Sequence, residues 1–152
     1  MDSEITTSTE RRDIIIDAVE YELVKHEPVE CPVVHRFTKG LYIREIFMPK
    51  GTLLTSKIHK TEHPFIVSKG KVSVWLDEGE EVLIEAPYCG ITLPNTRRVL
   101  YIHEDCIWTT IHATDKTTPE EVEEEIIQKH DNELLTQEEK EKFNLVYKIQ
   151  LQ

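Results

Sequence analysis

The sequence predicts a mainly β domain, an antiparallel barrel or sandwich, with helical segments at both ends. From residue 41 to residue 114, runs rich in apolar and β-branched residues recur about every 8–12 residues with Gly and Pro between them, as in all-β barrels and sandwiches. On both sides, apolar residues follow helical spacing and capping signals precede them. The length of 152 residues fits one domain.

The N-terminal part is expected to be a short tail and one helix. Residues 1–9 are polar and rich in Ser and Thr, and we expect them to be disordered. Thr9 can cap a helix that begins at Glu10, so that residues 10–30 would be this helix, continuing to about Lys25, and a connector. The expected apolar face consists of Ile15, Val19 and Leu23, with Ile16, Tyr21 and Val24 nearby.

The expected barrel spans residues 31–115 and contains about eight strands. Lys69-Gly70 separates two of the apolar runs, and this pattern predicts a hairpin there. The predicted strands are 41–47, 52–59, 63–68, 71–77, 82–86, 91–93, 97–103 and 106–113.

The C-terminal part, residues 116–152, is acidic and is expected to return to helix. Thr118 and Pro119 are typical of an N-cap and a first helical position, and this helix should continue to about His130. Thr136 and Glu139 have the spacing of a capping box, which predicts a second, short helix.

Composition excludes several classes of function. The net charge is −11, which argues against a nucleic-acid polymer as partner because phosphate contacts dominate that affinity. No apolar run approaches the ~20 residues of a membrane span, and the N-terminus has no signal-peptide pattern. The three cysteines are odd in number and far apart, as expected for free thiols in the cytoplasm.

Basic and imidazole side chains concentrate in the middle of the chain, around the segment from Gly51 to Gly70. Lys57 and His59 share one face of a predicted strand because strand residues alternate. If that strand pairs with the next through the turn at residues 60–62, His63 converges with them. The alternative is that these side chains are solvent-exposed polar residues near a turn.

This segment resembles the first motif of the cupin superfamily. Gly51 and Gly70 match its end glycines, His59 its second His and His63 its acidic ligand, while Lys57 stands in place of its first His. The second cupin motif corresponds to residues 94–99, where its His falls at Val99, or at Arg98 with a slip of one residue. The resemblance implies a cupin-like antiparallel β-barrel.

The departures from the cupin motifs argue against a bound metal. A metallo-cupin needs three or four nitrogen and oxygen ligands facing one point, and a protonated lysine cannot supply one. We therefore expect no cofactor. The alternative is a divalent transition metal held by His59 and His63, with His103 or His112 completing the site.

The same residues favour an anionic ligand. Arg presents a planar fork suited to phosphate and Lys a point charge, while aromatic faces allow a base to stack. Since Arg97 and Arg98 are adjacent on a strand, one of them must face outward and pair with acidic surface residues. The candidate ligand-binding residues are Lys57, His59, His63, Arg97, Arg98, Tyr101 and Trp108.

A second resemblance extends beyond the barrel motif. The runs 31–37, 40–49, 51–70, 94–99 and 103–112 are similar to a group of small cupin-like proteins of bacteriophages, over about residues 31–127. It implies a phage protein acting in the cytoplasm of the infected bacterium, and small phage proteins with basic pockets include sponges that sequester the cyclic nucleotides of CBASS defence.

Three functions follow from these patterns. The leading hypothesis is non-enzymatic sequestration of a small phosphorylated ligand, such as a cyclic dinucleotide. The second is a cupin enzyme acting on a small metabolite, either metal-dependent or using His as general base, and the third is a structural or interaction protein of the phage. Apolar residues on both faces of the last strands predict a homodimer or homotetramer. These residues are Leu100, Ile102, Ile107 and Ile111.

Overall fold

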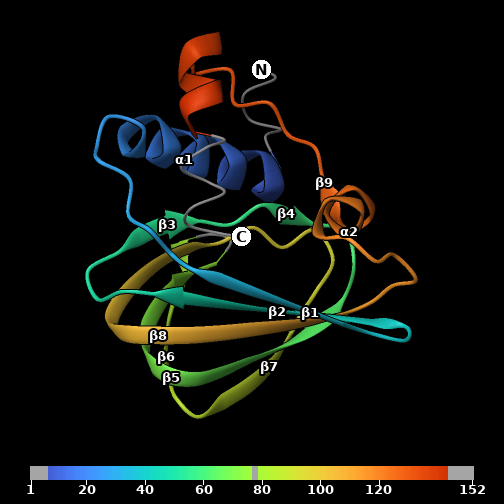
Figure 1. The fold of residues 1–152 in the computed structure, drawn as a ribbon. Helices are drawn as coiled ribbons and strands as arrows, with labels where there is room; N and C mark the ends of the chain where they lie inside the picture. Colours follow the sequence, from blue (N-terminus) through green and yellow to red (C-terminus); the bar gives the residue numbers. More distant parts are fainter. Residues whose placement is uncertain (1–6, 77–78, 144–152) are drawn as a thin grey trace.

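The computed structural model describes residues 7–76 and 79–143 and shows an antiparallel β-barrel with helices packed outside it (Figure 1). Seven strands form one sheet in the order β1-β2-β8-β5-β6, with β3 paired to β8 and β7 paired to β5. Two more strands, β4 and β9, pair with each other. The strands are β1 (Val33–Thr38), β2 (Leu41–Met48), β3 (Leu53–Thr55), β4 (Ile58–His59), β5 (His63–Trp75), β6 (Glu81–Glu85), β7 (Tyr88–Thr92), β8 (Val99–Ala113) and β9 (Ile127–Gln128).

The two longest strands, β5 and β8, each replace two predicted strands. The predicted hairpin at Lys69-Gly70 is wrong, because β5 continues through it as a 13-residue strand. Its pairing with β8 shifts register between Val67 and Val72, as expected for bulges. Gly70 is required there: its φ is +103°, and a Cβ would lie 2.5 Å from the carbonyl oxygen of Asp105.

The predicted strand 52–59 is divided, and neither part pairs with the strand that begins at His63. β3 pairs with β8, whereas β4 pairs with β9 and His59 forms an isolated bridge with Thr96. The edge strand β1 was not predicted at all. It pairs with β2 from Val33↔Ile46 to Thr38↔Leu41, although most of its residues are exposed.

The first helix, α1 (Ser8–Leu23), begins earlier than predicted. Thr7 caps it in place of Thr9, and the hydroxyl oxygen of Thr7 accepts a 3.0 Å hydrogen bond from the Glu10 amide. The expected apolar face is wrong at Ile15, which is 58% exposed. The residues that α1 buries are Arg12, Ile16 and Glu20, so polar contacts rather than apolar spacing orient this helix.

The C-terminal capping signals are confirmed. Thr118 caps α2 (Pro119–Ile126), and its hydroxyl accepts from the Glu121 amide at 3.3 Å. The helix is shorter than predicted because the chain changes to β9 at Ile127. Residues 137–143 are helical, and Thr136 and Glu139 form the expected capping box, with hydrogen bonds of 2.9 and 3.1 Å.

The expected N-terminal tail falls largely on residues 1–6, outside the described residues, while Ser8 and Thr9 are already helical. Within the described part of the chain, no helix is long and apolar enough to cross a membrane.

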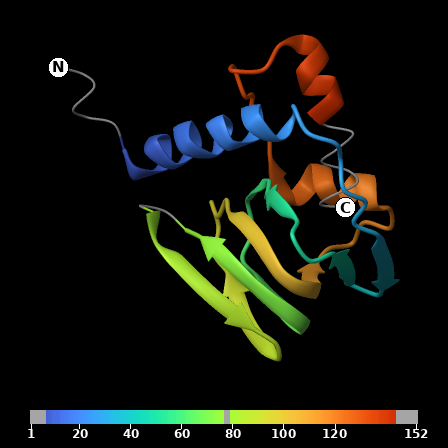
Figure 2. The same cartoon turned by 90° about the vertical axis from the view of Figure 1, so that its left-hand side faces the viewer.

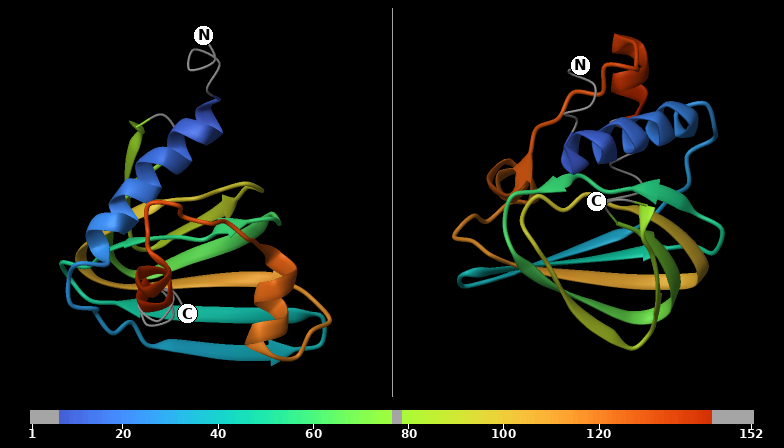
Figure 3. Two further views of the ribbon diagram at one scale, coloured as in Figure 1. Left: turned by 90° about the horizontal axis from the view of Figure 1, so that it is seen from above. Right: turned by 180° about the vertical axis from the view of Figure 1, so that it is seen from behind.

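The first and last helices lie on one side of the barrel, and α2 lies at one end of it. Figures 2 and 3 show α1 lying across the barrel, with residues 137–143 stacked above it and α2 beside β9 at one end. The barrel interior holds the main core cluster, which includes Leu54, Val67, Val72 and Ile102. Leu100 and Ile102 thus belong to the core, Ile107 and Ile111 are half-buried, and the homo-oligomer stays a prediction.

Candidate ligand-binding cavity

A cavity of about 190 Å³ lies inside the barrel at the end covered by α2. Alternation along β2 directs Tyr42 and Arg44 inward, and alternation along β8 directs Trp108, Thr110 and His112 toward them. The register places Tyr42 opposite His112 and Arg44 opposite Thr110. The cavity wall is therefore built from paired strands, which hold its side chains in fixed positions.

Three histidines meet in this cavity. His59 on β4, His63 at the start of β5 and His112 on β8 have ring centroids 4.8 Å (His59–His63), 4.3 Å (His63–His112) and 6.5 Å (His59–His112) apart. His63 and His112 are each 3% exposed, and His59 is half-buried with its Nδ1 fully buried. One buried nitrogen on each ring has no hydrogen-bond partner among the described residues: Nδ1 of His59, Nε2 of His63 and Nδ1 of His112.

Burial keeps these imidazoles neutral at pH 7. It lowers the pKa of His63, holds the pKa of His59 well below its usual value and lowers the pKa of His112 to about 3. Neighbouring positive charge adds to the effect, from Arg98 on His63 and from Arg44 on His112. A neutral imidazole offers one donor and one acceptor nitrogen, so the cavity contains hydrogen-bond acceptors beside its cations.

The lowered pKa of His112 predicts that acid destabilises the protein through this residue. In the unfolded state His112 binds a proton near its ordinary pKa of 6.5, whereas in the folded state it does so only near pH 3. The free energy of unfolding therefore has its full value above pH 6.5 and decreases as the pH falls from 6.5 toward 3. The variant His112→Asn should lose about 1 kcal/mol less stability than the wild type between pH 7 and pH 5.5. Urea unfolding at the two pH values measures this difference, and equal losses in both proteins would contradict it.

Arg98 supplies buried positive charge to the cavity. It is 9% exposed, and its guanidinium carbon lies 5.2 Å from the centroid of Phe65 and 5.7 Å from that of Trp108. Its hydrogen bond goes to the hydroxyl of Thr92 at 3.1 Å; among the described residues, no carboxylate pairs with it. Burial lowers its pKa to about 10, so the group remains charged at pH 7.

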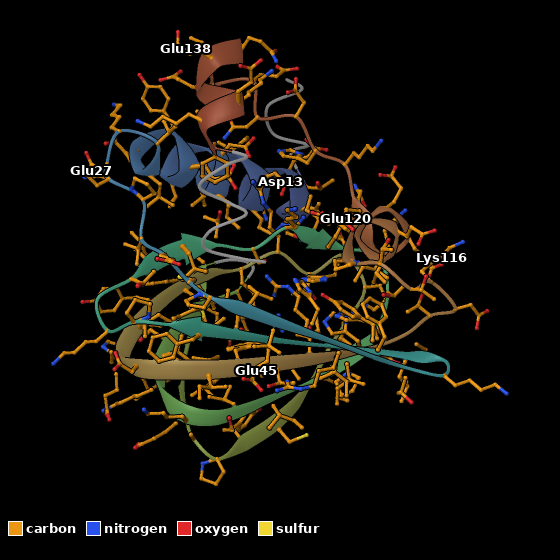
Figure 4. All side chains as sticks on the ribbon, viewed as in Figure 1. Asp13, Glu27, Glu45, Lys116, Glu120 and Glu138 are labelled. Atoms are coloured by element: carbon orange, nitrogen blue, oxygen red, sulfur yellow. The ribbon has the colours of Figure 1, made fainter. Side chains whose placement is uncertain are left out.

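Among the described residues, acidic side chains enter the cavity wall only from α2. Glu120 and Glu123 both line it, and Figure 4 shows Glu120 on α2 beside the end of the barrel. Lys57 also lines the cavity but forms an ion pair with Glu123. Lys57 therefore joins the barrel to α2 instead of standing as a separate anion ligand.

The two adjacent arginines have different roles. Arg97 points away from the cavity to α1, where it bonds Asp13 at 3.0 Å, Asp17 at 2.9 Å and Glu20 at 3.0 Å. Figure 4 marks Asp13 on α1, above the barrel. The expectation that one arginine pairs with acidic residues agrees with this arrangement, but the pairing is buried rather than at the surface, because α1 covers Arg97.

Two other predicted residues lie outside the cavity. Tyr101 is 37% exposed and packs edge-on against His103 at 5.0 Å, and His103 Nε2 lies 2.7 Å from the hydroxyl of Ser73. Trp108 does line the cavity and stacks on Phe65 at 4.6 Å. The structure thus brings together Lys57, His59, His63, Arg98 and Trp108, and leaves out Arg97, Tyr101 and His103.

Arg44 and Tyr42 are cavity residues that the sequence analysis missed. Both lie next to Ile43 on a strand that was predicted correctly. The sequence feature that could have identified them is a polar side chain at an inward-facing position of that strand. Their inward orientation was not recognised because Ile43 and Ile46 give the strand apolar residues on both faces.

Of the expected metal ligands, His59, His63 and His112 line the cavity together, and His103 does not. His103, an expected ligand, is bonded to Ser73 outside the cavity. In residues 7–76 and 79–143, no group of three or more His, Cys, Asp or Glu side chains is placed to hold a metal. The guanidinium groups of Arg44 and Arg98 line the same cavity and would repel a divalent cation.

Comparison with known proteins gives structural neighbours only. No family model and no curated protein matches the chain. Solved cupin-domain structures resemble it at low identity, such as a cupin-2 domain protein from Shewanella frigidimarina (11% identity, TM-score 0.45, covering 59% of this chain and 84% of that one). An RmlC-like cupin from Methanocaldococcus jannaschii is similar (14%, TM-score 0.48, 60% and 84%), as is the cupin domain of Schizosaccharomyces pombe Cnp3 (15%, TM-score 0.48, 59% and 65%).

Proposed function

We propose that the barrel cavity binds a small anionic ligand through a phosphate or carboxylate group and releases it unchanged. Arg98 carries this proposal. A buried charge without a partner costs several kcal/mol. The guanidinium of Arg98 is buried, and no described carboxylate pairs with it to offset this cost. An anion in the cavity would supply the missing opposite charge and accept a forked pair of hydrogen bonds from the guanidinium.

The rest of the wall supports an anion with an apolar part. Arg44 places a second guanidinium on the cavity, and the neutral imidazoles add hydrogen-bonding nitrogens without adding charge. Ile46, Met48, Leu100 and Trp108 line the remainder, which suits a short hydrocarbon or a ring.

The cavity volume limits the size of the ligand. An apolar cavity of roughly 150 Å³ accommodates benzene, whereas drug-sized ligands occupy roughly 300–1,000 Å³. At about 190 Å³, the cavity fits a small phosphorylated or carboxylated metabolite, or the phosphate of a larger molecule held at the mouth. The largest ligand that this proposal allows is a cyclic dinucleotide, sequestered by a phage protein. Most of that molecule would have to lie outside the cavity, beside Glu120 and Glu123.

Thermal unfolding with added ligands tests the proposal. EDTA-treated protein should be stabilised by inorganic phosphate, small carboxylates, mononucleotides or cyclic dinucleotides, because a ligand of the native state adds RT ln(1 + [L]/Kd). The variant Arg98→Met should lose the shift, and the control Arg36→Met, which removes an exposed ion pair with Glu45, should keep it.

Two outcomes of this experiment would contradict the proposal. Absence of any shift across the panel would remove the anion site, and a shift that persists in Arg98→Met would place the ligand elsewhere. Recovery of the intact ligand separates binding from turnover, so a chemically altered ligand would instead indicate the enzyme that the sequence analysis kept as an alternative.

A further inference from the structure

The hydrogen bond of His63 fixes which of its nitrogens carries the proton. Nδ1 of His63 lies 3.0 Å from the backbone carbonyl oxygen of Thr61. A carbonyl oxygen can only accept a hydrogen bond, so Nδ1 must be the N–H donor. In the neutral ring, the other nitrogen, Nε2, then has a lone pair and no hydrogen.

The lone pair of Nε2 belongs to the cavity. His63 lines it and is 3% exposed, and Nε2 is fully buried with no hydrogen-bond partner among the described residues. Arg98 lines the same cavity, close enough for its charge to act on His63. The site therefore presents a charged donor and a buried acceptor to one ligand.

We propose that the preferred ligand carries an O–H or N–H donor next to its anionic group, with an anionic oxygen on Arg98 and the donor hydrogen on Nε2 of His63. This inference rests on the proposed function and specifies its ligand class. Hydrogen phosphate, a phosphomonoester in its monoanionic form and an α-hydroxy acid all have this pair of groups.

Among the described residues, a hydrogen bond to a carbonyl oxygen fixes the tautomer of His63 but not that of His59 or His112, the other histidines of the cavity. His112 can adopt either tautomer, because its Nε2 bonds the hydroxyl of Thr110, which both donates and accepts. Arg44 and Lys57 only donate. Glu120 and Glu123 accept, but they enter from α2, and Glu123 is paired with Lys57.

The acceptor would make the cavity discriminate between anions of equal size. An anion without a hydrogen would place an oxygen lone pair against the lone pair of Nε2 of His63. Neither that oxygen nor Nε2 would then form a hydrogen bond with the other. A site that is built to bond a ligand hydroxyl rejects the analogue that lacks it, because buried polar groups are left without partners.

Titration calorimetry with two matched ligand pairs tests this inference. At pH 7 in EDTA, inorganic phosphate carries a P–OH group and sulfate does not, and lactate carries a hydroxyl that propionate lacks. We expect phosphate to bind at least 10-fold more tightly than sulfate, and lactate more tightly than propionate. The variant His63→Phe should bring each ratio close to one, while the control His103→Phe, outside the cavity, should leave the ratios unchanged.

The outcomes separate the two proposals. Binding of all four anions with equal affinity would overturn the inference about the ligand hydrogen and leave the anion site in place. Absence of binding by all four would overturn this inference, and absence of any thermal shift across the wider panel would overturn the proposed function as well. If His63→Phe fails to fold, ¹⁵N NMR of the wild type decides: a hydrogen on Nδ1 of His63 supports the inference, and a hydrogen on Nε2 overturns it.

Discussion

Replacing Arg97 with Met is expected to lower the free energy of unfolding by about 3–5 kcal/mol, the usual cost of removing one partner from a buried ion pair. The Arg97 side chain is 3% exposed and holds Asp13, Asp17 and Glu20 together. Without it, the carboxylate of Glu20, whose side chain is 6% exposed, would keep, within residues 7–76 and 79–143, only the donors of Thr55 and Asn132. The three carboxylates would also repel one another.

Urea unfolding monitored by circular dichroism at pH 7 measures this loss. Arg36→Met is the matched control, because the Arg36–Glu45 pair is exposed and such pairs contribute only about 0–1 kcal/mol. A loss below about 1 kcal/mol in Arg97→Met would mean that the carboxylates are compensated by other groups.

Replacing the neighbouring Arg98 with Met is expected to have the opposite effect on stability. Burial lowers the pKa of Arg98 from 12.5 to about 10, which corresponds to about 3 kcal/mol against the charged form in the folded state. Met removes that penalty. It also removes the ring contacts with Phe65 and Trp108 and the hydrogen bond to Thr92, which together stabilise the wild type by about 1–2 kcal/mol. The ligand-free variant should therefore be about 1–2 kcal/mol more stable than the wild type, while its affinity for phosphate falls at least 100-fold.

Both quantities can be measured on one preparation. Urea unfolding of dialysed, EDTA-treated protein gives the stability, and calorimetry with inorganic phosphate gives the affinity. If Arg98→Met were less stable by more than about 1 kcal/mol without ligand, Arg98 would be satisfied inside the protein, and the argument for an anion would lose its basis. Stabilisation together with unchanged phosphate affinity would place the anion site elsewhere.

The fold class could be predicted because it depends on local patterns that survive in the folded chain. Alternation and turn residues gave most strands between residues 41 and 113, and the caps at Thr118 and Thr136 depend on spacing alone. The hairpin at Gly70 failed because a glycine with positive φ serves a turn and a bulge equally well. What decides between them is the long-range pairing with β8, which no local pattern contains.

The candidate site was predictable in part for the same reason. Lys57, His59 and His63 lie in a recognisable motif, but Arg44 lies on a strand whose alternation does not mark the inner face. The choice between Arg97 and Arg98 depends on where α1 docks, and α1 docks through Arg12, Ile16 and Glu20 rather than through its apolar spacing. Such contacts join residues about 80 positions apart, beyond the reach of a sequence pattern.

The segments on either side of the barrel strands are part of the pocket's architecture. α2 closes one end of the cavity, and β9 pairs with β4, the strand that carries His59. α1 supplies the carboxylates that bind Arg97. A shortened protein with only residues 31–115 would expose Arg97 and leave the cavity open at the end where Lys57 now meets Glu123. Truncation at residue 30 or 116 would therefore change the proposed binding site even though it leaves the strands of the seven-stranded sheet intact.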